Sequence, residues 1–253
     1  MKILISNDDG IMAPGIRVLK EYLEKEHDVY VVAPDVERSA TGHAITIRNP
    51  LWAKKISFGN NFFGFAVNGT PADCVKLGLQ AIYKDIDFDI VISGINKGAN
   101  LGTDILYSGT VSAALEGALS GKPSIAVSCI DFNQPNFEDA AKIILDILKK
   151  LDPKEIPEFT TLNINVPNIP YDEIKGLKIT RQSKRRYNDY FEERKDPYGN
   201  SYYWMLGKVI EDDDENYSDY YCARDGFVSI TPITVFLTNT DFTIPLKNIL
   251  GVR

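Results

Sequence analysis

The first two thirds of this chain alternate short apolar runs with segments of helical periodicity, and this alternation constrains the fold more than any other feature. Runs typical of buried strands lie at 2–6, 29–33, 90–93, 124–128 and 161–166. Apolar residues recur at helical spacing in about 16–25, 110–119 and 140–151. Strands that alternate with helices in this way form right-handed crossovers. We therefore expect an α/β fold, Rossmann-like and three-layered, with a mostly parallel sheet.

Two regions depart from this alternation. Residues 40–68 contain strand-like runs at 44–47, 51–56 and 62–67 without a helix between them, which predicts a β-hairpin insertion. From Lys178 onward, aromatic-rich strand signals at 202–206 and 227–230 predict a β-rich C-terminal extension over about 178–253. The acidic run 211–215 reads as a charged loop that points into water. We find no linker that divides the chain, so we expect one domain over 1–253.

A helix start interrupts the strand signals after the predicted insertion. Thr70 is a good N-cap residue, Pro71 suits the first helical position, and Asp73 stands three residues after the cap. The segment therefore predicts a helix that begins at Pro71.

The charge and hydropathy of the chain exclude several classes of partner. The net charge of −7 argues against a polynucleotide, which binds through many Lys and Arg residues. No apolar run reaches the roughly 18–20 residues that cross a bilayer, and the N-terminus does not resemble a signal peptide. We expect a cytoplasmic protein without a membrane partner. The basic cluster Arg181, Lys184, Arg185 and Arg186 is either a solvated face or a rim that attracts an anionic substrate.

Cysteine and histidine are too few to form the common structural metal centres. Cys74, Cys129 and Cys222 are widely separated and flanked by apolar residues, which is typical of buried free thiols. His27 and His43 are the only histidines. A metal ion would therefore be held mainly by oxygen, which favours Mg²⁺, Mn²⁺ or Ca²⁺.

Polar residues follow three of the predicted strands, at the edge where ligands bind in an open parallel sheet. Asp8 and Asp9 follow the first strand, Ser39 lies after the second, and Asn96 and Asn100 belong to a Gly-rich stretch after the third. Adjacent carboxylates behind a buried strand are costly unless a cation compensates them. An aspartate at such a turn can also cap a helix. The doublet, followed by Gly10, favours the metal interpretation.

The Gly-rich stretch leads into Ser108-Gly109-Thr110 at the start of a predicted helix. Small residues at a helix N-terminus leave backbone N–H groups that can bind a phosphate. The alternative is simple capping by Ser108 or Thr110 without a ligand. Neither a Walker A sequence nor G-x-G-x-x-G after the first strand is present, which argues against a dinucleotide cofactor.

Taken together, these motifs resemble the survival protein SurE family of nucleoside 5′-monophosphate phosphatases. The segments that carry the resemblance follow in the family's order: ILISNDDG at 3–10, VVAPDVERSATGHAIT at 31–46, VNGTPADCVKLGL at 67–79, VISGINKGANLGTDILYSGTVSAALEG at 91–117, LNINVP at 162–167 and GFVSITPI at 226–233. The acidic run and the last dozen residues lie outside these segments.

The resemblance implies a site as well as a fold. It implies one divalent cation, Mg²⁺ or Mn²⁺, held by Asp8, Asp9, Ser39 and Asn96. By position, Ser108, Gly109 and Thr110 would form the phosphate pocket, and we add Asn100 as a further substrate-binding residue. Asp8 and Asp9 would be catalytic through the metal. His43 is our candidate for the acid that protonates the leaving group, although it could equally stabilise its loop.

The function that follows is metal-dependent hydrolysis of nucleoside 5′-monophosphates. Activity on 3′-nucleotides or short polyphosphate stays open. One alternative is a phosphatase that uses Asp8 or Asp9 as a nucleophile, but such enzymes use Asp-x-Asp spacing. Another is a non-catalytic nucleotide sensor with the same pocket. Because family members exchange their C-terminal regions, the resemblance also implies a homodimer or homotetramer.

Overall fold

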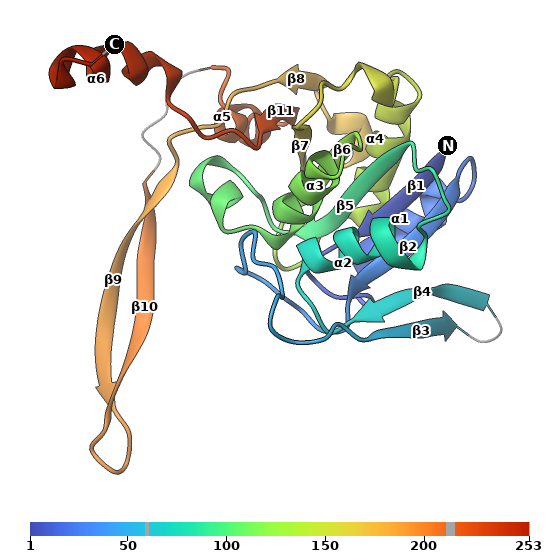
Figure 1. Cartoon of the computed structure of the whole chain (residues 1–253), viewed down its shortest axis with the longest axis horizontal. Helices are drawn as coiled ribbons and strands as arrows, with labels where there is room; N and C mark the ends of the chain where they lie inside the picture. The colour runs from blue at the N-terminus through green and yellow to red at the C-terminus, as the bar shows by residue number, and fades with distance from the viewer. Residues whose placement is uncertain (59–60, 211–215, 253) are drawn as a thin grey trace.

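The chain forms a large mixed sheet flanked by helices, with a separate hairpin that projects from the body (Figure 1). The structure, a computed structural model, describes residues 1–58, 61–210 and 216–252. The acidic run 211–215, for which we expect a charged loop, lies outside the described residues. The main sheet has the order β3-β4-β2-β1-β5-β6-β7-β11-β8. Its strands are β1 (Lys2–Ser6), β2 (Asp28–Pro34), β3 (Ala53–Phe58), β4 (Asn61–Val67), β5 (Ile90–Lys97), β6 (Ser124–Ile130), β7 (Thr160–Pro167), β8 (Leu177–Ile179) and β11 (Val228–Thr234).

The central strands run parallel, as the alternation of strands and helices predicts. The strands β4, β2, β1, β5, β6 and β7 pair in parallel with their neighbours. Among the described strands of the main sheet, only two pairings are antiparallel, β3 with β4 and β11 with β7, and β8 runs parallel to β11. The predicted three-layer α/β fold is therefore confirmed.

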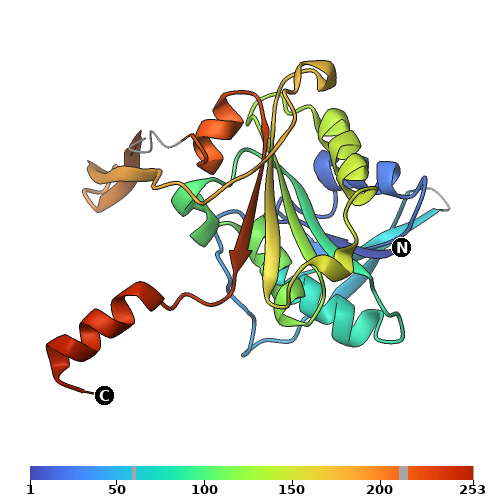
Figure 2. The ribbon, with the colours of Figure 1, turned by 90° about the horizontal axis from the view of Figure 1, so that it is seen from above.

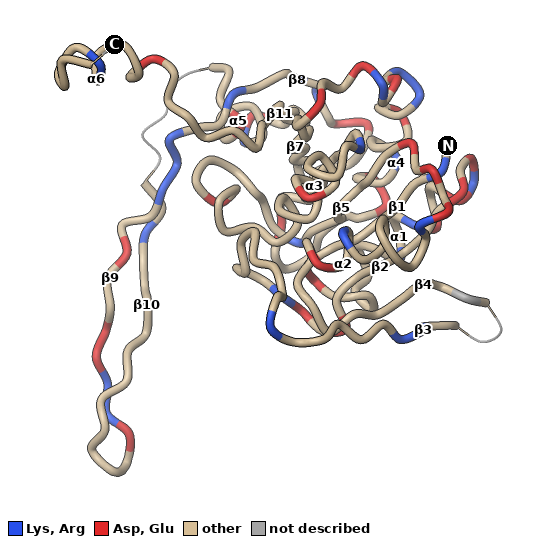
Figure 3. Tube along the Cα trace, viewed as in Figure 1, with Lys and Arg blue, Asp and Glu red and all other residues tan. Residues whose placement is uncertain are grey.

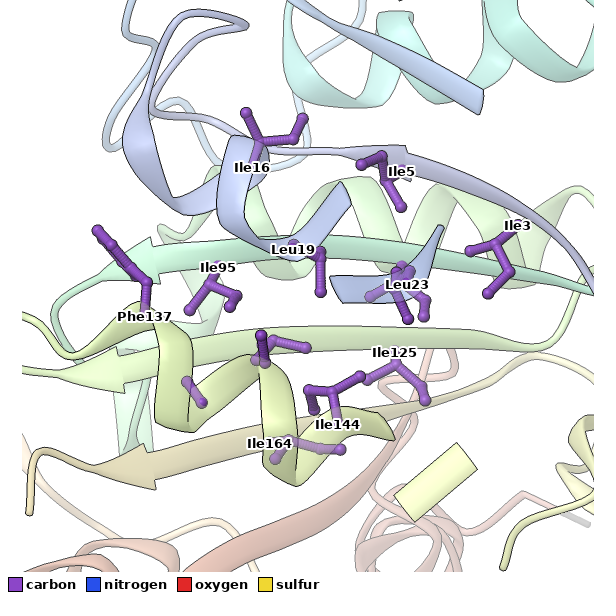
Figure 4. Packing of buried hydrophobic residues seen from close by; sticks show 14 of the residues in the cluster. Ile3, Ile5, Ile16, Leu19, Leu23, Ile95, Ile125, Phe137, Ile144 and Ile164 are labelled. Carbon is purple, nitrogen blue, oxygen red and sulfur yellow. The ribbon is translucent and has the colours of Figure 1, made fainter. Parts of the chain in front are cut away.

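Helices cover both faces of the sheet because side chains alternate along the buried strands. Ile3 and Ile5 of β1 pack with α1 (Pro14–Leu23) and α4 (Phe137–Leu148) on one face (Figure 4). Leu4, between them, packs on the other face with α2 (Pro71–Leu77) and α3 (Gly109–Leu119). Every position of this strand from Ile3 onward is consequently buried. The polar residues that follow β1 lie at the carboxyl edge of the sheet.

The N-terminus of α2 organises the segment that precedes β3. Thr70 and Asp73 form the predicted capping box. Asp73 also accepts hydrogen bonds from the amide and the hydroxyl of Thr46, at 2.9 and 2.6 Å, and the Thr70 hydroxyl donates to Ala44 O at 2.7 Å. Side chains thus bind the backbone polar groups of 44–47, and the strand predicted there is absent. The hairpin itself is confirmed as β3 and β4, with β4 extending the main sheet beside β2.

The C-terminal extension contains both strands and helices. The strands β9 (Arg186–Lys195) and β10 (Ser201–Ile210) form a two-stranded sheet that projects from the body (Figures 1 and 2). The helices α5 (Asp219–Arg224) and α6 (Thr240–Leu250) begin after the caps Ser218 and Asn239, and our sequence analysis missed both. The expected β-rich extension is confirmed in β9, β10 and β11, and it contains these two helices in addition. The helix α6 has no buried residue and lies away from the body (Figure 2).

Short helical turns complete the fold. They are the π-helical turn η1 (Gly78–Ile82) and the 3-10 turns η2 (Gly102–Leu106), η3 (Pro153–Glu155) and η4 (Tyr171–Glu173). All three cysteines are buried and free, as expected. Within the described ranges, no helix combines the length and apolar content that crossing a bilayer requires.

Candidate active site

The three polar loops predicted to meet at the carboxyl edge of the sheet line one cavity of about 710 Å³. It contains the four proposed metal ligands, Asp8, Asp9, Ser39 and Asn96. Two of the four residues predicted to bind substrate also line it, Asn100 and Ser108. Sequence analysis missed the rest of the lining, which is Ala40, Lys97, Ala99, Asp104, Tyr107, Phe132, Tyr187, Asp189, Met205, Leu206 and Gly207.

Asp8 is the most buried acid of the cavity. Its burial raises the pKa of the carboxyl group, although hydrogen bonds from Thr110 lower it in part. The Thr110 hydroxyl donates to Asp8 Oδ1. A Cβ atom at Gly109 would stand 2.7 Å from Asp8 Cβ, closer than real atoms approach. The start of α3 therefore packs directly against Asp8 and fixes its side chain.

Asp9 is less buried and stands beside the same charge. Burial and then the neighbouring Asp8 raise the pKa of Asp9 to about 6. The carboxylate accepts a hydrogen bond from the Lys97 amide at 3.3 Å, at the end of β5. Positive φ at Gly10 (+96°) gives the turn after the doublet a backbone that favours glycine, as predicted.

Ser39 and Asn96 add neutral oxygens to this edge. The Ser39 hydroxyl is exposed and donates to Glu37 Oε1 at 2.7 Å. The Asn96 amide nitrogen donates to Gly98 O at 2.8 Å, so the amide oxygen remains for a ligand. Hydroxyl, amide and carboxylate oxygens from three loops thus face one cavity.

This donor set fits a hard divalent cation. The raised pKa values show that the protein leaves the charges of Asp8 and Asp9 incompletely compensated. Among the described residues, no group of three or more His, Cys, Asp or Glu could hold a metal ion. A cation at the cavity would therefore depend on the mixed oxygen set, which suits Mg²⁺ or Mn²⁺ and not the softer metals.

Asn100 is held by two buried asparagines of β7. Its N–H donates to Asn165 Oδ1 at 2.8 Å, and its carbonyl accepts from the Asn163 and Asn165 amides at 2.8 and 3.1 Å. Its own amide nitrogen donates to Ser128 Oγ at 2.7 Å. Asn163 and Asn165 lie two residues apart, and therefore on the same face, in the apolar part of β7, and this pattern in the sequence could have revealed them.

The Ser108-Gly109-Thr110 segment differs from a simple phosphate cradle. Ser108 Oγ caps α3 by accepting from the Val111 amide at 3.1 Å, and the Ser108 amide donates to Asp104 O at 3.0 Å. Thr110 does not line the cavity, and its hydroxyl is used by Asp8. Ser108 therefore caps α3 and also lines the cavity, whereas Gly109 and Thr110 contact Asp8, where we had expected substrate.

His43 does not line the cavity. Its Nε2 lies 3.0 Å from Oε2 of the buried Glu116, whose other oxygen is 2.6 Å from Lys76 Nζ. Burial alone would raise the pKa of Glu116, but the hydrogen bonds of His43 and Lys76 outweigh it and lower the pKa. The histidine thus joins its loop to α3, in agreement with the loop-stabilising alternative.

The basic cluster lies where the projecting hairpin joins the body (Figure 3). Arg185 forms an ion pair with Asp104, and its guanidinium lies 5.2 Å from the centre of the Tyr187 ring. The buried Asp219 accepts from the amides of Ser183 and Gly102, each at 3.0 Å. Arg185 is therefore no solvated surface residue. It joins the root of the hairpin to η2, beside the cavity.

Comparison with known proteins places these features in a family. The sequence profile described as Survival protein SurE matches residues 3–189. Proteins named 5′-nucleotidase SurE from Petrotoga mobilis and Kosmotoga olearia are 71% and 62% identical over 252 and 247 residues, covering 100% and 98% of this chain and 100% and 97% of theirs. The crystal structure of the SurE protein from Aquifex aeolicus superposes with a TM-score of 0.85 at 44% identity, over 99% of this chain and 100% of that one.

Proposed function

From the premise that this chain belongs to the survival protein SurE family, we propose that the cavity after β1 hydrolyses nucleoside 5′-monophosphates with a divalent cation. The chain is a 5′-nucleotidase. The observation that carries the metal dependence is the pair of adjacent acids directly after β1, with the pKa of Asp9 raised to about 6. A cation would offset both the repulsion between the two neighbouring carboxylates and the cost of burying their charges.

Asp8, Asp9, Ser39 and Asn96 would hold the cation, and a bound cation would supply stabilisation of the negative charge on the phosphoryl oxygens. Gly109 and Thr110 keep Asp8 in place through close packing and a hydrogen bond. Asn100 and Ser108 line the same cavity and orient the phosphate ester. The asparagines behind Asn100 fix the backbone of its turn, so the ester meets a preorganised surface.

His43 has a supporting role in this account. Its hydrogen bond to the buried Glu116 fixes the 40–48 loop, which also contributes Ala40 to the cavity. A histidine that donates the proton to the leaving group would have to face the cavity. We therefore expect His43→Ala to lower activity through the loop, and His43→Gln to retain most of it.

Turnover with a defined metal content tests the proposal. The enzyme is stripped with a chelator, checked by elemental analysis, and assayed for phosphate release from a nucleoside 5′-monophosphate. Activity should vanish and return on addition of Mn²⁺ or Mg²⁺. Full turnover by metal-free enzyme would refute the metal dependence. Tight nucleotide binding without phosphate release at saturating Mn²⁺ would favour the nucleotide-sensor alternative.

A second copy of the chain is the partner that we propose for the hairpin and α6. Tyr203, Trp204 and Met205 of β10 are exposed, as are Ile244 and Ile249 of α6. Exposed apolar surface of this extent is typical of protein interfaces. A homodimer or homotetramer should appear in analytical ultracentrifugation, and Trp204→Glu should shift it towards the monomer. An unchanged monomer for both proteins would contradict the assembly.

The cysteines support a cellular location. Cys74, Cys129 and Cys222 are buried and free, which suits a compartment that keeps thiols reduced. We propose that the enzyme works in the cytoplasm.

A further inference from the structure

Phe132 exposes a large aromatic ring at the cavity that contains the acidic residues. It lies in the loop 131–136 between β6 and α4, lines the cavity, and is 72% exposed. Single exposed apolar residues are ordinary on a protein surface. The cavity wall that includes Phe132 also contains other apolar and aromatic side chains, such as Met205 and Leu206, whereas the acids lie at the edge of the sheet. The cavity therefore offers a ligand both a polar and an apolar surface.

The ring rests on the backbone of the turn that holds Asn96. A Cβ atom at Gly98 would stand 2.4 Å from one carbon of the Phe132 ring and 2.7 and 3.1 Å from two others. Only glycine leaves room for this contact. Gly98 O also accepts the hydrogen bond from the Asn96 amide. The aromatic ring and a proposed metal ligand are therefore positioned by the same turn.

The loop that carries Phe132 is fixed by side-chain hydrogen bonds. Asp131 Oδ1 accepts from the amides of Asn133 and Gln134 at 2.7 and 3.3 Å. Asn168 donates to Asp131 Oδ2 at 2.8 Å and accepts from the Asn136 amide at 2.7 Å. These bonds tie the loop to the end of β7. The loop backbone that carries the ring is thus fixed before a ligand arrives, which lowers the entropic cost of binding.

A second aromatic side chain lines the same cavity from the hairpin. Arg185 Nη2 donates to the Tyr187 hydroxyl at 3.2 Å, and Arg185 is itself paired with Asp104. Tyr107 lines the cavity as well, so three aromatic rings from separate segments share it with the edge that contains Asp8 and Asp9. Its volume of about 710 Å³ lies within the range of pockets that enclose whole small-molecule ligands.

We propose that Phe132 is the platform on which the nucleobase of the substrate stacks, with Tyr187 as a second aromatic wall. The inference rests on the proposed function, because it requires the phosphate to lie at the cation that Asp8 and Asp9 would hold while the base reaches the ring. Stacking on an aromatic side chain accepts any base, since every base presents a π-face. Purine nucleotides, with the larger face, gain more from it than pyrimidine nucleotides.

The test compares a nucleoside 5′-monophosphate with ribose 5-phosphate, which has the same ester and sugar but no base. Phe132→Ala should lower kcat/KM for the purine nucleotide about tenfold, through KM, and leave that for ribose 5-phosphate within about twofold. Phe132→Tyr should restore the preference. Tyr198→Ala is the matched control, because Tyr198 is 91% exposed at the hairpin tip and does not line the cavity.

The outcomes separate this inference from the proposed function. Equal losses on both substrates in Phe132→Ala would mean that the ring supports the turn at Gly98 and binds no base. A parent enzyme that shows no preference for the nucleotide over ribose 5-phosphate would also overturn the platform, although phosphatase activity would stand. An effect in Tyr187→Ala without one in Phe132→Ala would overturn the assignment to Phe132. Failure of the proposed function would appear instead as no phosphate release from either substrate with Mn²⁺.

Discussion

Strands β1 and β10 are both rich in apolar residues, yet their surroundings are opposite. Ile3, Leu4 and Ile5 of β1 are fully buried between two neighbouring strands and two helical layers. In β10, Trp204 is 55% exposed, and β9 is the only partner of the strand in the part of the chain that the structure describes. An isolated two-stranded hairpin is marginally stable in water. Burial in the core therefore stabilises β1, whereas β10 stays largely exposed. The second copy of the chain proposed above would supply the hairpin with a partner surface.

The cavity draws on both regions. The body supplies Asp8 and Asp9, the acids that we propose as metal ligands, at the end of a strand in the core of the sheet. The hairpin supplies Tyr187, Asp189 and the segment 205–207. Arg185 contacts Tyr187 and forms an ion pair with Asp104 of the body, and Asp189 pairs with Gly207 across the hairpin. The comparison suggests a division of labour in which the body performs the chemistry and the hairpin adjusts the fit of the substrate.

The largest effect that would sharpen this division is expected from Asp8→Asn. It removes one charge from the metal-binding edge while keeping the size of the side chain, and kcat/KM should fall by about a hundredfold or more. Asp189→Asn makes the same chemical change in the hairpin wall of the cavity and should cost less than about tenfold. Steady-state kinetics at saturating Mn²⁺ measure both, and equal losses would break the comparison.

The next largest effect is expected in the free energy of unfolding, when a variant of the body is compared with a variant of the hairpin. Ile144→Ala removes a fully buried side chain of α4 (Figure 4) and should lower the free energy of unfolding by about 2–5 kcal/mol. Trp204→Ala in the hairpin should cost less than about 1 kcal/mol in dilute protein, because the ring is largely solvated. Urea unfolding followed by circular dichroism gives both values. A hairpin variant as destabilised as the core variant would show that the hairpin stabilises the body.

A smaller effect tests how α3 supports the acid. Thr110→Val keeps the shape of the side chain but removes the hydroxyl that donates to Asp8. We expect kcat/KM to fall about tenfold for a nucleotide and for ribose 5-phosphate alike. Thr110→Ser should recover most of the loss. A selective loss for the nucleotide alone would place Thr110 in contact with substrate, as we had first expected from the sequence.

The smallest effect concerns the pH dependence of the metal-free protein. Burial and Asp8 raise the pKa of Asp9 from its ordinary 3.8 to about 6. The folded state then binds this proton more tightly than the unfolded state, so stability falls as pH rises from about 4 to about 6 and stays lower above that. Asp9→Asn removes this loss. Its melting temperature should exceed that of the parent at pH 7.5 but not at pH 4, and a gap that does not change with pH would contradict the cause.

The sequence predicted the central layers and the meeting of three loops because both follow from local periodicity and the direction of parallel strands. It did not predict that 44–47 would be irregular, since the partners of this segment, Thr70 and Asp73, lie about 26 residues away. The contact of Thr110 with Asp8 spans 102 residues and is invisible to any local pattern. The helices α5 and α6 were missed although Ser218 and Asn239 are ordinary caps, because the aromatic residues around them favoured strands.

Calorimetric titration of the metal-free protein with Mn²⁺ tests the central claim most directly. The claim is that Asp8, Asp9, Ser39 and Asn96 together bind one divalent cation at the carboxyl edge of the sheet. We predict one ion per chain for the parent protein and a large loss of affinity for Asp8→Asn, with the fold of the variant verified by circular dichroism. Binding of equal affinity and stoichiometry in the two proteins would contradict the account.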